Sequence, residues 1–162
     1  MTDQPHILGV DVGGVIIDRQ ADGTDTSFFS KNYKRTPAVE GAFETLARLA
    51  GSFEIHLVSK CGETVEGKTR SWLKTNSFHE TTGISPDRLH FCRERKDKAA
   101  ICATLGVTHF VDDRLEVLSY LGSVPHLFLF RPTEEEVRQF VAFLPRVKRV
   151  NAWAEIERAL RG

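Results

Sequence analysis

Runs of apolar residues alternate along this chain with segments in which apolar positions recur at the spacing of a helix. The runs are typical of buried strands, and we predict strands from His6 to Asp11 and at residues 53–59, 89–92, 108–113, 126–130 and, at an edge, 146–150. Helices are predicted at residues 37–50, 63–74, 97–105, 115–121 and 134–144, and after Asn151. Strands that alternate with helices predict an α/β fold with a doubly wound, mostly parallel sheet.

Local signals set the expected ends of these helices. Pro37 suits a first helical turn, and Gly51 would end the helix that follows it. Asp97 and Asn151 are expected to cap the helices that follow them, and Gly106 would close the first of these two.

Residues 16–37 are polar and contain glycine, without the period of a strand or helix. We therefore predict a flap at residues 16–37, whose Phe28, Phe29 and Tyr33 cover part of a site. Residues 81–88 are predicted to form a loop. No repeat or linker divides the chain, so residues 1–162 are expected to form a single domain.

Composition narrows the expected partners and compartment. The chain has 22 basic and 22 acidic residues, so its net charge gives no strong signal for nucleic acid or for an anionic membrane. No apolar run has the length of a membrane span, and the start MTDQPH lacks the pattern of a signal peptide. The 3 cysteines form no C-x-x-C pair, which favours a reducing compartment, and we expect a cytoplasmic protein.

Reactive side chains follow the predicted strands. Asp11 ends the first run and precedes a glycine pair, Ser59 ends the second, and Asp112 and Asp113 end the fourth. The carboxyl ends of parallel strands meet at one edge of a sheet, where ligands bind. Lys98 lies at the start of a predicted helix and is expected to reach the same edge, with Lys96 as an alternative.

The order of these residues resembles that of the haloacid dehalogenase (HAD) superfamily over nearly the whole chain. The first family motif, D-x-D-G-[TV], is similar to residues 11–15, DVGGV. The strand that ends in Ser or Thr corresponds to LVS at Ser59, the lysine to Lys98, and the strand with paired acids to FVDD. The resemblance implies a Rossmann-like, three-layer α/β/α fold and hydrolysis of phosphate esters through an aspartyl-phosphate.

The resemblance also implies a role for each residue. Asp11 would be the nucleophile, and Ser59 and Lys98 would contact the transferring phosphoryl group. The ligands implied for Mg²⁺ are Asp11, the carbonyl of Gly13, Asp112 and Asp113, since Mg²⁺ prefers oxygen donors. Asp113 would hold a metal-bound water or orient Lys98. Phosphate would be bound by Gly13, Gly14, Ser59 and Lys60.

Gly13 departs from the family pattern. In most phosphatases of the superfamily, this position is a second Asp that protonates the leaving group and later activates water. Such acid-base help is worth about 10²- to 10⁴-fold, so an alkyl phosphate should react slowly here. Three outcomes remain open: a substrate with a good leaving group such as an acyl phosphate, a replacement acid such as Asp18 or a flap residue, or an inactive phosphate-binding or interaction module.

The chain has no sizeable insertion after the first motif or between the second and third, which is similar to the capless members of the superfamily. Capless members act on large substrates or cover the site by oligomerising. The resemblance leaves two substrate classes open, a small phosphorylated metabolite and a phosphorylated macromolecule, and it leaves open a homo-oligomer.

A different interpretation rests on residues 62–69, GETVEGKT, which match the pattern G-x-x-x-x-G-K-[ST] of a nucleotide-binding P-loop. FVDD could then supply the acid for magnesium. Against this interpretation, Glu63 and Glu66 would place negative charge in a loop that must cradle phosphates. The simpler alternative is a surface helix that Gly67 weakens.

Overall fold

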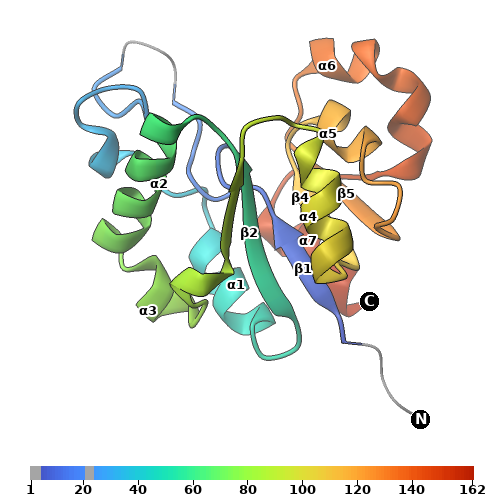
Figure 1. The fold of residues 1–162 in the computed structure, drawn as a ribbon, viewed down its shortest axis with the longest axis horizontal. Helices are drawn as coiled ribbons and strands as arrows, with labels where there is room; N and C mark the ends of the chain where they lie inside the picture. The colour runs from blue at the N-terminus through green and yellow to red at the C-terminus, as the bar shows by residue number, and fades with distance from the viewer. Residues whose placement is uncertain (1–4, 21–23) are drawn as a thin grey trace.

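The computed structural model describes residues 5–20 and 24–162, and its centre is a sheet of 6 parallel strands (Figure 1). In spatial order the strands are β3 (Leu89–Cys92), β2 (Glu54–Lys60), β1 (Ile7–Val10), β4 (His109–Asp112), β5 (His126–Phe130) and β6 (Lys148–Val150). The chain runs from β1 to one edge and then returns to β4, so the strand order reverses between β1 and β4. The doubly wound sheet predicted from the sequence is confirmed.

Helices cover both faces of the sheet and complete three layers. One hydrophobic core joins the sheet to α1 (Ala42–Leu49), α2 (Glu63–Thr75), α3 (Phe78–Thr82) and α7 (Trp153–Arg161). A second core joins the opposite face to α4 (Asp97–Leu105), α5 (Leu115–Ser119) and α6 (Glu134–Gln139). Figure 1 shows α1, α2 and α3 on one side of the sheet and α4, α5 and α6 on the other. None of the helices in the described part of the chain is long and apolar enough to span a membrane.

The alternation of side chains along β5 explains how one strand serves both cores. Leu127 and Leu129 are buried against α4, α5 and α6, whereas Phe128 and Phe130 are buried in the other core. Successive side chains of a strand point to opposite faces, so an unbroken apolar run is the pattern of a strand covered on both sides.

Two buried tryptophans fix the segment that follows β1. The indole Nε1 of Trp153 in α7 donates a hydrogen bond to the carbonyl of Val15 (2.9 Å), and Nε1 of Trp72 in α2 donates to the carbonyl of Thr36 (2.8 Å). The two helices therefore hold the chain at Val15 and at Thr36.

Two expected boundaries are wrong on the face of the sheet that α1, α2 and α3 cover. Helix α1 begins at Ala42 rather than at Pro37, because Ala38 forms an antiparallel bridge with Ile17 and Gly41 has a φ of 81°. The loop predicted at residues 81–88 instead begins with the end of α3, which Gly83 closes at a φ of 79°, and contains a 3₁₀ turn at Pro86–Arg88. Phe78 is buried and anchors α3 in the core.

Three expectations for the later helices are also corrected. The helix predicted at residues 134–144 ends at Gln139, and a 3₁₀ segment at Val141–Arg146 follows it. Asn151 does not cap α7; its backbone amide donates to Glu155, and Ala152 precedes the first turn. The N-cap position of α4 is Lys96, so Asp97 is the first helical residue.

Candidate active site

The two central strands bring three acidic side chains together at the point where the strand order reverses. Asp11 directly follows β1, and its amide donates a hydrogen bond to the carbonyl of Val111 in β4 (2.9 Å). Asp112 ends β4, and Asp113 follows it. Oxygen atoms of Asp11, Asp112 and Asp113 lie within 4.8 Å of one another, and all three residues are buried. Open α/β sheets bind their ligands at this position.

Lys98 links two of these acids. Its Nζ donates hydrogen bonds to Oδ1 of Asp11 (3.0 Å) and Oδ2 of Asp112 (2.8 Å), and its side chain is 2% exposed. Burial lowers the pKa of Lys98, but attraction by Asp11 and Asp112 outweighs burial and raises the pKa above its usual value. Lys98 is therefore a buried ammonium ion, whereas Lys96 is exposed. Of the two roles that the sequence left open for Asp113, orienting Lys98 falls to Asp11 and Asp112 instead.

The environment of the acids suits a hard cation. Burial, followed by repulsion from Asp11, raises the pKa of Asp112 to about 6 even though Lys98 opposes the shift. Burial and repulsion from Asp11 and Asp112 raise the pKa of Asp113 well above its usual value. A divalent cation would relieve this repulsion, and carboxylate oxygens are the donors that Mg²⁺ prefers. The donor set therefore fits Mg²⁺.

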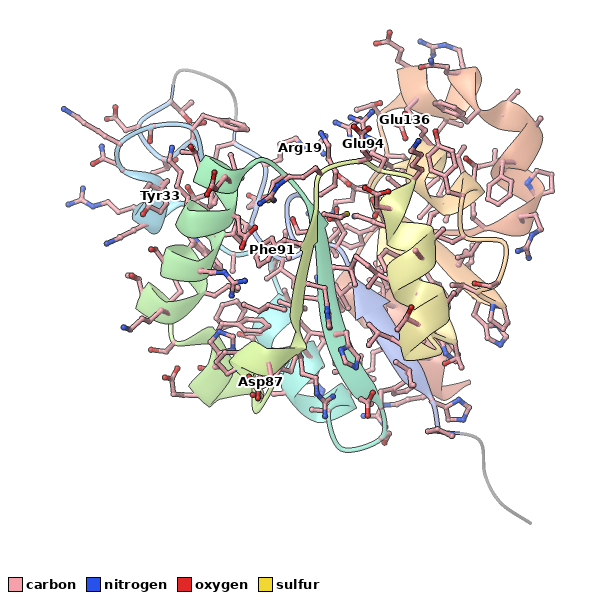
Figure 2. The ribbon with its side chains drawn as sticks, in the orientation of Figure 1. Arg19, Tyr33, Asp87, Phe91, Glu94 and Glu136 are labelled. Carbon is pink, nitrogen blue, oxygen red and sulfur yellow. The ribbon has the colours of Figure 1, made fainter. Side chains whose placement is uncertain are left out.

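A cavity of about 480 Å³ lies over this cluster. It is lined by each residue that the sequence assigned to the site, namely Asp11, Gly13, Gly14, Ser59, Lys60, Lys98, Asp112 and Asp113. Phe28 and Phe29 of the flap also line it, but Tyr33 does not. The Tyr33 ring instead lies under Nζ of Lys68, 5.2 Å from the ring centre, and Figure 2 shows Tyr33 on the α2 side of the molecule.

The two glycines after Asp11 differ in what surrounds them. Gly14 has a φ of 81°, and a Cβ atom there would overlap Oδ2 of Asp113, so this position requires glycine for both reasons. A Cβ atom at Gly13 would have no heavy atom within 4 Å. Gly13 therefore occupies a place with room for the first atom of a side chain, and Gly14 does not.

Sequence reasoning missed three arginines that line the cavity. Arg19 pairs with Asp113, Arg95 pairs with Glu116 (3.2 Å), and Arg114 pairs with Glu136 (3.2 Å). Arg114 directly follows the paired acids, and that adjacency was an available signal. The direction of the Arg19 side chain from an aperiodic segment was not readable from the sequence.

The P-loop interpretation is wrong. Residues 63–69 belong to α2, and Gly67 lies inside that helix rather than in a loop. The hydroxyl of Thr69 donates to the carbonyl of Val65 one turn earlier (2.8 Å), which is a helical contact. Lys68 does not line the cavity.

Comparison with known proteins identifies the class of fold. No protein-family model matches the sequence, and no match is found among curated proteins. Among solved structures, a HAD-family hydrolase from Deinococcus radiodurans R1 with bound phosphate and sodium aligns with a TM-score of 0.64 and 13% identity, over 98% of this chain and 96% of that chain.

Two further structures agree with this assignment of the fold. A phosphoserine phosphatase in its apo form aligns with a TM-score of 0.53 and 11% identity, over 84% of this chain and 91% of that chain. A haloacid dehalogenase-like family hydrolase from Xanthomonas campestris aligns with a TM-score of 0.52 and 15% identity, over 76% of this chain. This chain spans about half (54%) of the Xanthomonas protein. The fold is that of the HAD hydrolases.

Proposed function

We propose that this chain is a Mg²⁺-dependent phosphohydrolase of the HAD superfamily in which Asp11 is the nucleophile. The observation that carries the proposal is the arrangement of Asp11, Lys98 and Asp112 at the carboxyl ends of β1 and β4, in a fold shared with HAD hydrolases. The proposed substrate is a phosphorylated metabolite or a phosphorylated macromolecule.

The proposed reaction has two steps. A carboxylate oxygen of Asp11 attacks phosphorus, a new O–P bond forms, and the ester O–P bond breaks as the leaving group departs with the electron pair. Water then hydrolyses the aspartyl-phosphate and releases phosphate. Lys98 holds the attacking carboxylate in place and neutralises charge, and the hydroxyl of Ser59 donates to a phosphoryl oxygen. Mg²⁺, held by Asp11, Asp112, Asp113 and the carbonyl of Gly13, would screen the charges of nucleophile and phosphate.

Gly13 restricts the proposed substrate. It has no side chain that could protonate a departing alkoxide, so leaving groups that need no proton are favoured. Acyl and aryl phosphates have such leaving groups. Asp18 also lines the cavity, which makes it the replacement acid to test; its carboxylate accepts a hydrogen bond from Gln20 (3.0 Å).

The first experiment measures turnover of an acyl phosphate and an aryl phosphate with and without Mg²⁺. We expect activity that requires Mg²⁺ and is abolished in Asp11→Asn. Asp87→Asn is the matched control, because Asp87 lies in a 3₁₀ turn at the opposite end of the molecule from Arg19 (Figure 2). Activity that survives Asp11→Asn would show that another residue is the nucleophile.

The second experiment restores the missing acid. Because a Cβ atom at Gly13 meets no neighbour, Gly13→Asp should fold normally. We expect turnover of an alkyl phosphate to rise by about 10-fold or more, at the low end of the range for general acid catalysis. Gly13→Asn, which has nearly the same shape but no acid, is the control. Equal rates in the two variants would rule out Gly13 as the cause of slow turnover.

The alternative function is a phosphate-binding or interaction module without turnover, and the absence of an acid at Gly13 is the observation that favours it. This alternative predicts that inorganic phosphate binds with Mg²⁺ while no phosphate ester is hydrolysed, even in Gly13→Asp. Calorimetric binding of phosphate, measured beside the two turnover assays, separates it from the hydrolase.

A further inference from the structure

Arg19 reaches into the acidic cluster from the flap and pairs with Oδ2 of Asp113. The Asp113 side chain is 4% exposed, whereas that of Arg19 is 54% exposed, so the guanidinium enters a buried site from the solvent side. The pair lies directly against Gly14, because a Cβ atom there would overlap Asp113 and come within 3.1 Å of the Arg19 guanidinium. Gly14 thus provides the space in which Arg19 and Asp113 meet.

The residues on both sides of Arg19 are held by hydrogen bonds, through the backbone at Asp18 and through the side chain at Gln20. The amide of Asp18 donates to the carbonyl of Pro37 (2.8 Å). The side chain of Gln20 donates to Asp18 (3.0 Å) and accepts from the hydroxyl of Thr26 (3.0 Å). Arg19 therefore projects from a held position, and only its side chain needs to move for the guanidinium to leave Asp113.

Arg19 and Lys98 form ion pairs with different acids of the cluster. Lys98 contacts Asp11 and Asp112, and within the described residues Arg19 is the cation paired with Asp113. A divalent cation held by the same acids and the Arg19 guanidinium would both be attracted to the Asp113 carboxylate, and their positive charges would repel each other. Lys98 is buried and bonded twice, but Arg19 is largely solvated and is the cation that can be displaced.

We propose that Arg19 is an internal competitor of the divalent cation at Asp113, and that the cation releases its guanidinium toward the anionic substrate in the same cavity. The inference rests on the proposed metal site. It makes Arg19 a positioning residue that couples the two ligands: an anion that holds the released guanidinium favours the metal-bound arrangement, and the metal favours anion binding to the same degree.

The test measures Mn²⁺ affinity by electron paramagnetic resonance, on the full chain without substrate. Removing the competing charge in Arg19→Gln should tighten Mn²⁺ binding by about tenfold, whereas Arg19→Lys should stay close to the unmodified protein. Arg95→Gln is the matched control, because Arg95 lines the same cavity but pairs with Glu116. Thermal unfolding checks that each variant is folded.

A double-mutant cycle assigns the effect to Asp113. In Asp113→Asn, where the side chain is a neutral amide, a further Arg19→Gln substitution should change Mn²⁺ affinity less than about twofold. Inorganic phosphate supplies the second readout. It should tighten Mn²⁺ binding more in the unmodified protein than in Arg19→Gln, because only the former must release a guanidinium.

The outcomes separate this inference from the proposed function. If the unmodified protein binds Mn²⁺ and Arg19→Gln binds it equally or more weakly, Arg19 is not a competitor, and the metal site stands. If neither protein binds Mn²⁺ at millimolar concentration, the metal-dependent function fails and the inference fails with it. If Arg95→Gln increased Mn²⁺ affinity as much as Arg19→Gln, the effect would come from the overall charge of the cavity. That result would also overturn the inference.

Discussion

Lys98 extends from the first turn of α4 and places one positive charge between two buried carboxylates. Its neighbour Lys96 precedes the same helix and is exposed. The two lysines have the same charge and lie two positions apart, so burial and hydrogen bonding are what distinguish them. A comparison of their variants therefore measures what the buried contact contributes.

Replacing Lys98 by Met should destabilise the fold by about 3 kcal/mol or more at neutral pH, because Asp11 and Asp112 would remain buried without their shared cation. Urea unfolding gives this free energy directly. Lys96→Met, the matched control, should change stability by less than about 0.5 kcal/mol. A similar loss in both variants would mean that the buried contact adds nothing beyond a surface charge.

The cavity-lining residues at strand ends were predictable from the sequence, and Arg19, which lines the same cavity, was not. Asp11, Ser59 and Asp112 follow apolar runs, so the parallel sheet alone brings them to one edge. Arg19 lies in a segment without a period, where nothing in the sequence gives the direction of a side chain. The sequence also left open whether Asp113 orients Lys98, because neighbouring acids in a sequence do not reveal which one faces a given helix; the contact is with Asp112.

At the scale of elements, α2 carries a glycine in its interior. Gly67 is exposed, lies between the ends of Glu63–Thr75, and has no heavy atom within 4 Å of a Cβ position. Gly67→Ala should therefore stabilise the protein by about 0.5 to 1 kcal/mol, because alanine loses less conformational freedom in a helix. Thermal or urea unfolding measures the gain.

Gly83→Ala is the contrasting variant. Gly83 closes α3 at a φ of 79°, so a side chain is strained there although the space around it is open. We expect a loss of about 1 kcal/mol. If both variants were more stable than the unmodified protein, the positive φ of Gly83 would not disfavour a side chain there. Lower stability of Gly67→Ala would contradict the helical conformation at that position.

The sequence predicted the strands better than the helix ends. Strand β5 lies at the predicted residues 126–130, since an unbroken apolar run fits a strand buried on both faces. The start of α1 was misplaced because the bridge between Ile17 and Ala38 is a contact between distant segments. Helix α6 was predicted too long, because residues 141–146 retain apolar side chains although their backbone is a 3₁₀ helix with Pro145 inside.

At the scale of the whole molecule, the two ends of the sheet carry different ionisable groups. The carboxyl ends of β1 and β4 carry the acidic cluster, whereas the other end carries stacked histidines. The His109 and His126 rings stack with centres 4.5 Å apart, and His6 lies 5.6 Å from His109. The stacked histidines and the acidic cluster therefore lie at opposite ends of the sheet.

Burial, with repulsion from His126 and His6, lowers the pKa of His109 from 6.5 to about 4. Between these values the unfolded chain binds a proton that the folded ring does not, so this contribution to stability is present above pH 6.5 and is lost as the pH falls toward 4. Because solvent at the ring edge weakens the effect, we expect the free energy of unfolding to fall by about 2 kcal/mol as the pH falls toward 4.

Urea unfolding of His109→Phe at pH 7.5 and pH 5 tests this expectation, since Phe keeps the ring stacking with Phe128 but cannot take up a proton. The variant should lose less stability than the unmodified protein between the two pH values. That difference isolates His109, because the buried acids titrate equally in both proteins. His79→Gln, a substitution outside the stack, should follow the unmodified protein. If His109→Phe and the unmodified protein lost the same free energy of unfolding between the two pH values, the pH dependence of stability would arise from other residues.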